Sequence, residues 1–209
     1  AEVKLYYNGS ALNTIALKET VPFVLSVNGA VADIDLTPLS AMKGALASGM
    51  TVPEAMRMFS YQDLLVGFKS GSFGEVSAVA LLLGFVWLLV RRVITWRIPV
   101  YVLGTMALFT GILWAVNPDQ YMSPVFHLLT GGALLGAIFM ATDYVTSPMT
   151  NRGMLLYGIG IGAITVLIRI WGQYPEGMSF AILIMNAFVP LIDKYVKPRR
   201  FGAVRKARA

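Results

Sequence analysis

EVSAVALLLGFVWLLVRR, residues Glu75 to Arg92, is the stretch that decides the fold class of this chain. One carboxylate precedes an almost unbroken apolar run, and two arginines end it. Such a run is typical of a membrane helix whose charged ends lie at the lipid surface. The whole chain agrees, because 56% of its 209 residues are hydrophobic and 13% are charged, whereas soluble domains carry about a quarter charged residues.

Four more apolar runs follow, and each run is 15 to 19 residues long. The five runs cover residues 76–90, 98–116, 125–141, 154–171 and 178–192. The shortest reach a spanning length of about 20 residues only with their flanking residues. We therefore expect an all-α integral membrane fold of five transmembrane helices in residues 76–195. An extramembrane segment, residues 1–75, precedes it, and a basic tail, residues 196–209, follows.

The basic residues predict the orientation of these helices. Eleven of the 17 lie at the ends of the first, third and fifth runs, and seven of the eleven lie from Lys194 onward. The two opposite connectors hold none, apart from Arg169 at a helix end. The positive-inside rule then places the C-terminus in the cytoplasm and residues 1–75 on the extracytoplasmic side. The basic tail is thus interpreted as a topology anchor, and we expect no nucleic-acid partner.

Cysteine is absent from the chain, and there is one histidine. This composition excludes a disulfide, a thiolate zinc site, an iron–sulfur cluster and a bis-histidine haem within these residues. If electrons pass through the chain, their carrier is organic or belongs to a partner.

Four polar residues within or next to the apolar runs are candidates for a role beyond helix packing. Glu75 is either a carboxylate at a helix N-terminus, solvated by headgroups, or a ligand or ion contact. Arg169 either pairs locally with Glu176 or holds an anionic cofactor. His127 has no second ligand at metal spacing and is expected to be structural. Asn186 is expected to bind a neighbouring helix.

Two short patterns need separate interpretation. The segment YGIGIGA places Gly158 and Gly162 four residues apart inside an apolar run. It lacks the strand and spacing of a dinucleotide loop, so we expect close helix packing there. The connector ATDYVTSPMTNRG, residues 141–153, offers Asp143 and Thr146 at the cytoplasmic face. It is a candidate contact for a ligand headgroup or a partner subunit.

Six ordered segments carry a resemblance to a known family. They are GSFGEVSAVALLLG, ITWRIPV, FHLLTGGALLGAIFMATD, TSPMTNRG, LIRIWGQYPEGMSFAILIMNAFVPLID and KPRRFG. Together they resemble the D subunit (RnfD) of the Rnf complex, a membrane-bound ion-translocating ferredoxin:NAD oxidoreductase. The B subunit of the sodium-translocating NADH:quinone reductase (NqrB) is a close relative. Tyr144 departs from the family pattern, which has a proline there.

The resemblance implies a fold, a cofactor and partners. Family members have two inverted five-helix halves in a urea-channel-like fold, of which this chain matches the second. It implies an inner-membrane subunit that relays electrons through bound flavin, as FMN and possibly riboflavin, between ferredoxin and NAD, coupled to Na⁺ or H⁺ transport. The partners would be membrane lipid and the A, B, C, E and G subunits of the Rnf complex. The alternatives are an NqrB-like subunit and a non-redox solute channel.

The resemblance also implies a site in the extramembrane segment. Related D subunits carry FMN as a phosphoester on a threonine, and Thr37 in DIDLTPLSAMK best matches this acceptor. Pro38 favours an extended backbone at Thr37, which would present the hydroxyl to a transferase. The family's small residues before the threonine are replaced here by Ile34, Asp35 and Leu36, and Asp35 would repel a phosphate. An ordinary acidic turn is the other interpretation.

Overall fold

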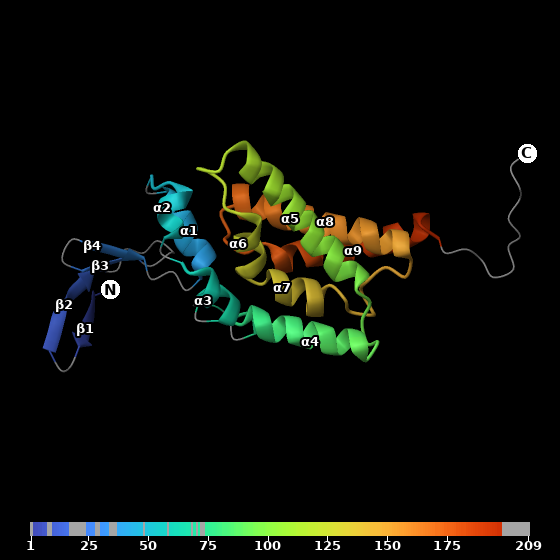
Figure 1. Ribbon diagram of the computed structural model, residues 1–209, viewed down its shortest axis with the longest axis horizontal. Helices are drawn as coiled ribbons and strands as arrows, with labels where there is room; N and C mark the ends of the chain where they lie inside the picture. The colour runs from blue at the N-terminus through green and yellow to red at the C-terminus, as the bar shows by residue number, and fades with distance from the viewer. Residues whose placement is uncertain are drawn as a thin grey trace, which may run out of the picture. The chain divides into compact units, whose positions relative to one another are not determined.

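The computed structural model describes residues 2–7, 10–16, 24–27, 30–33, 37–47, 49–57, 59–67, 69, 71 and 74–197 (Figure 1). The chain divides into two compact units. Unit 1 holds Ala1–Ala80 and Thr110–Gly131, and unit 2 holds Leu81–Phe109 and Gly132–Ala209. The residues beyond 197, which include most of the basic tail, lie outside the described part of the chain, as do Ile34, Asp35 and Leu36.

Two antiparallel strand pairs open unit 1. Strand β1 (Glu2–Tyr7) pairs with β2 (Ser10–Ala16), and β3 (Val24–Val27) pairs with β4 (Ala30–Asp33). The register places Val3 opposite Ile15 in the first pair and Leu25 opposite Ala32 in the second. From Pro38 to Tyr195 the described elements are all helical. The helical expectation thus holds for the apolar region, while the segment before it also contains strands.

Four short helices also belong to unit 1. They are α1 (Pro38–Ala47), α2 (Val52–Met56), α3 (Tyr61–Val66) and α6 (Pro124–Leu129). Leu39, Met42, Leu64 and Phe126 are at most 1% exposed and form their common core. Phe59 packs edge-on against Phe126, with ring centroids 6.0 Å apart. This core anchors α1, which begins immediately after Thr37.

A capping box starts helix α2. The Thr51 backbone N–H donates to Glu54 Oε2 at 3.1 Å, which satisfies an amide at the helix start. This hydrogen bond, together with that to the Thr51 hydroxyl, holds the pKa of Glu54 below its ordinary value. The carboxylate therefore stays charged to a lower pH than an ordinary glutamate, and the positive end of the helix dipole favours this charge.

Apolar helices occupy four of the five expected positions. They are α4 (Ala78–Val90), α5 (Arg97–Val116), α8 (Asn151–Trp171) and α9 (Met178–Tyr195). Among the described residues, α5, α8 and α9 are long and apolar enough to cross a membrane, and α4 is a shorter apolar helix. The chain is therefore a multi-pass membrane protein.

Large apolar side chains lie on the outer surfaces of these helices. Leu83, Trp87 and Val90 on α4 are 65% to 71% exposed, and Leu183 on α9 is 69% exposed. In water, contiguous exposure of this kind would drive aggregation or association. In a bilayer the same side chains contact lipid, so the exposure agrees with membrane insertion.

Glycines allow the helices of unit 2 to pack closely. A Cβ added at Gly158 would lie 2.6 Å from Tyr101 Cβ, and one at Gly162 would lie 2.8 Å from the Val102 carbonyl oxygen. Both glycines of α8 therefore abut α5 without room for a side chain. The expectation that Gly158 and Gly162 serve helix packing is confirmed.

Candidate functional site

The third apolar segment contains a break, which contradicts its prediction as one continuous helix over 125–141. Helix α6 ends at Leu129, and the chain resumes in α7 (Ala133–Leu135) and the π-helix η1 (Gly136–Met140). Thr130 between them is extended, and Gly131 has a φ of +63°. Glycine adopts this left-handed backbone without the steric penalty of a Cβ. The Gly131–Gly132 pair is thus the physical reason for the break.

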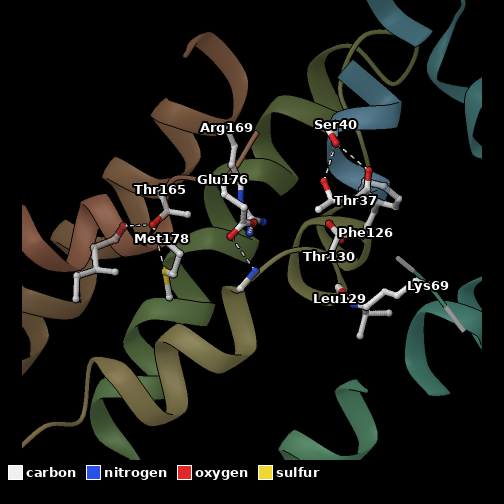
Figure 2. A network of polar contacts seen from close by, with 12 residues as sticks. Thr37, Ser40, Lys69, Phe126, Leu129, Thr130, Thr165, Arg169, Glu176 and Met178 are labelled. Carbon is white, nitrogen blue, oxygen red and sulfur yellow. Dashed lines mark hydrogen bonds and ion pairs between the residues drawn. The ribbon is translucent and has the colours of Figure 1, made fainter. Parts of the chain in front are cut away.

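A glutamate and an arginine hold the second half of this broken segment. The Gly132 backbone N–H donates to Glu176 Oε2 at 2.9 Å, and the Arg169 guanidinium donates to Glu176 Oε1 at 2.9 Å (Figure 2). Arg169 is fully buried, whereas the Glu176 side chain is 31% exposed. The local ion pair expected for Arg169 is confirmed. Because the same carboxylate also binds the Gly132 backbone, it links the connector after α8 to the break.

Further polar contacts fix α8 near this pair. The Thr165 hydroxyl donates to the Ile161 carbonyl at 2.8 Å and lies 3.4 Å from Met178 Sδ (Figure 2). The Tyr157 hydroxyl donates to Asn186 Oδ1 at 2.6 Å, so Asn186 joins α9 to α8 as expected. Within unit 2, the charged pair therefore lies beside helices that are held in register by side-chain hydrogen bonds.

In unit 1, side chains satisfy the carbonyl end of α6. The Lys69 ammonium donates to the Leu129 carbonyl, and the Thr130 hydroxyl donates to the Phe126 carbonyl at 2.6 Å (Figure 2). A cation is favoured at this end because the helix dipole is negative there. His127 in the same helix is 2% exposed, and the described residues contain no cluster of metal-ligating side chains.

Thr37 is the N-cap of α1. Its Oγ1 lies 2.7 Å from Ser40 Oγ and accepts from the Ser40 backbone N–H at 3.3 Å, while Ser40 Oγ donates to the Thr37 carbonyl at 3.0 Å. The residue is half-buried and its hydroxyl is engaged, whereas the Thr-Pro pattern suggested a freely presented hydroxyl. These contacts place Thr37 at the start of a ten-residue helix.

The other predicted site residues have different surroundings. Glu75 is 8% exposed, and a Cβ added at Gly71 would lie 3.3 Å from its Oε1. The expectation of a headgroup-solvated carboxylate is therefore wrong, because the side chain is buried. Asp143 and Thr146 meet in an exposed connector, where the Thr146 hydroxyl donates to Asp143 Oδ2 at 3.1 Å.

Sequence reasoning did not identify two residues that hold the broken segment in place. Gly132 lies within the segment and binds Glu176, and Lys69 binds the segment at Leu129. The adjacent glycines at 131 and 132 within an apolar run were the available signal for the break. No sequence signal identified Lys69, because its contact with Leu129 joins residues 60 positions apart.

Comparison with known proteins agrees with the sequence resemblance. The model of the NQR2, RnfD, RnfE family matches residues 12–202. The D subunit of the proton-translocating ferredoxin:NAD(+) oxidoreductase complex of Clostridium ljungdahlii is 40% identical over 181 residues, covering 87% of this chain and 55% of that protein. The D subunit of the Na(+)-translocating complex of Acetobacterium woodii is 42% identical over 171 residues, covering 81% of this chain and 49% of that protein.

The D subunit of an ion-translocating oxidoreductase complex of Stutzerimonas stutzeri is 37% identical over 200 residues, covering 87% of this chain and 56% of that protein. The chain thus spans about half the length of the curated relatives it matches. The family match covers most of the chain, including both halves of the broken segment and the Arg169–Glu176 pair. The chain belongs to the NQR2, RnfD, RnfE family.

Proposed function

We propose that this chain is part of a membrane subunit of an ion-translocating electron-transport complex of the Rnf type. It would relay electrons through bound flavin between ferredoxin and NAD and couple this to transport of Na⁺ or H⁺. The observation that carries the proposal is the similarity to D subunits over 79% to 87% of the chain. Those relatives are named for different ions, a proton in one case and Na⁺ in another, so similarity does not select the ion.

The broken third segment supports a transport role within the membrane. Discontinuous helices in transporters expose backbone groups at a site inside the bilayer. Here Glu176 and the fully buried Arg169 hold that backbone at Gly132. A fully buried arginine in a membrane protein is costly, and such a residue is a candidate for an ion or substrate pathway. Arg169, Glu75, Asp143 and Thr146 remain proposed contacts for cofactor or partner groups.

Thr37 is the proposed attachment point for FMN, and its geometry fits a phosphoester. An ester oxygen at Oγ1 can still accept the hydrogen bond from the Ser40 N–H, whereas the contact with Ser40 Oγ would then need the Ser40 hydroxyl as its donor. The phosphate would lie at the start of the ten-residue α1, where the helix dipole favours negative charge. The bound flavin would supply the redox chemistry that the side chains of this composition lack.

Two substitutions distinguish the role of Thr37 as the N-cap of α1 from its proposed role as the flavin acceptor. Thr37→Asn keeps a good N-cap but has no hydroxyl to esterify, whereas Thr37→Ser keeps both. We expect Thr37→Asn to abolish in-gel flavin fluorescence without destabilising α1, and Thr37→Ser to retain fluorescence. Ser40→Ala is the matched control, because it removes the neighbouring hydroxyl and leaves the Thr37 acceptor intact.

Mass spectrometry supplies the second measurement. The peptide that contains Thr37, taken from the assembled complex, should carry the mass of FMN minus water. An unmodified peptide from an active complex would contradict the flavin site and leave Thr37 as a helix cap. A purified complex without flavin absorbance would instead favour the non-redox channel, and reduction of quinone would favour the NqrB-like subunit.

The same proposal includes the topology and the partners. Five membrane crossings, with the third interrupted, would place the C-terminus in the cytoplasm of a bacterium and residues 1–75 on the other side of its inner membrane. The A, B, C, E and G subunits of the Rnf complex would supply the remaining carriers and contact surfaces.

A further inference from the structure

A pocket of about 470 Å³ lies in unit 2 where α8 begins and α9 ends. Helix α8 contributes Arg152, Leu155 and Leu156, and the last residue of α9 and the two that follow it contribute Tyr195, Val196 and Lys197. The two helices run antiparallel, since a Cβ at Gly153 would meet Ile192 and one at Gly160 would meet Met185. Their adjacent ends therefore build one pocket at a single end of the helix pair.

The lining residues are arranged by depth. Arg152 is the second residue of α8, and Leu155 and Leu156 follow three and four positions later, on the same helix face and about one turn further along. The side chains of these leucines are 38% and 51% exposed. The pocket thus has a cationic end at Arg152 and, about one helix turn further along, a partly exposed apolar wall. Tyr195 adds an aromatic side chain of the kind that lies at membrane interfaces.

The charges of the pocket favour an anion. Its six lining residues include two cations and no acid, and the cations are Arg152 in α8 and Lys197 just after α9. The neighbouring Asp193 accepts from the Met149 backbone N–H at 3.4 Å. The N-terminus of α8 adds positive partial charge, which the C-terminus of α9 opposes, and Lys194 lies in the last turn of α9. Arginine and lysine together are well suited to bind a phosphate.

We propose that this pocket binds an anionic phospholipid. Its phosphate would lie between Arg152 and Lys197, and an acyl chain would run along Leu155 and Leu156. The cations and the apolar wall follow one another in the same order as the headgroup and the acyl chain of a lipid. A site for soluble phosphate would not need the apolar wall. Basic pockets between membrane helices are known to select anionic headgroups in this way.

Lipid titration with native mass spectrometry tests the proposal on the full chain in detergent. The probes are dioleoyl phosphatidylglycerol, dioleoyl phosphatidylcholine and inorganic phosphate. We expect phosphatidylglycerol to bind at least tenfold more tightly than phosphatidylcholine, and the double variant Arg152→Gln/Lys197→Gln to lose about tenfold in affinity for it. Arg152→Lys in place of Arg152→Gln should restore part of that loss.

The double variant Arg91→Gln/Arg92→Gln is the matched control, because it removes two exposed cations at another helix end. It should bind phosphatidylglycerol as the unaltered chain does. Equal loss in both double variants would show a general charge effect and overturn the site. Equal binding of the two lipids would also overturn it, as would displacement of phosphatidylglycerol by millimolar inorganic phosphate, which would show a free-anion site.

Discussion

Glu176 is the residue through which two parts of unit 2 are joined. Its two carboxylate oxygens accept from the buried Arg169 and from the Gly132 backbone. Glu176→Gln should therefore destabilise the protein by about 2 kcal/mol, because Arg169 would keep a buried charge facing a neutral amide. This is below the range for a fully buried pair, since Glu176 is 31% exposed. Thermal unfolding of the purified protein measures the loss.

A double-mutant cycle isolates the charge interaction. Arg169→Gln/Glu176→Gln should unfold at a higher temperature than Glu176→Gln alone, because no unbalanced charge remains. If the two single losses simply add in the double variant, the ion pair does not stabilise the fold.

Some contacts of individual residues were predicted from the sequence and others were not. The difference is whether the contact joins residues that are close together in the sequence. The Arg169–Glu176 pair was predictable because the two residues are seven positions apart around one short turn. The burial of Glu75 was not, because it depends on how residues before α4 pack around it. Thr37 was predicted as an exposed acceptor, yet the helix that it caps begins at the very next residue. A Thr-Pro pair also fits an N-cap followed by proline at N1, which was the overlooked pattern.

At the scale of helices, the contact of α8 with α5 depends on glycine. Gly158→Ala places a Cβ 2.6 Å from Tyr101 Cβ and should destabilise the protein by about 1–3 kcal/mol, although alanine is the better helix former. Gly104→Ala on α5 is the control, because its Cβ would meet nothing within 4 Å. That change should be neutral or stabilising by up to about 1 kcal/mol. If Gly158→Ala and Gly104→Ala changed the unfolding temperature equally, helix propensity rather than packing against α5 would determine the effect of both substitutions.

Hydropathy predicted the helices wherever an apolar run forms one continuous helix. Four apolar runs became α4, α5, α8 and α9 within a few residues of their expected ends. The third run failed because hydropathy counts glycine as compatible with a helix, whereas Gly131 has a left-handed backbone. The strand pairs were also missed, although Asn8–Gly9 and Asn28–Gly29 separate the paired strands in the sequence. Asn-Gly between apolar runs is a strong hairpin signal.

For the molecule as a whole, the broken segment determines the topology. If residues 124–140 cross the membrane, the connectors on either side of them face opposite compartments. If they enter and return on one side, every later helix crosses the membrane in the opposite direction. The 17 residues from Pro124 to Met140, which hold α6, the break, α7 and η1, would be marginal for one straight span, so their length alone does not decide between these cases.

Single cysteines can decide it, because the chain has none of its own. We expect Gln120→Cys and Tyr174→Cys to react with an impermeant maleimide in intact cells, since both positions are exposed in the connectors that lack lysine and arginine. Val145→Cys, at a position that is 89% exposed, and a cysteine added after Arg208 should react only after lysis. Reaction of Gln120→Cys and Val145→Cys from the same side would show that the broken segment does not cross. Labelling after Arg208 and at Val145→Cys in intact cells, with Gln120→Cys reacting only after lysis, would reverse the assigned orientation and place Thr37 on the cytoplasmic side, away from an extracytoplasmic flavin transferase.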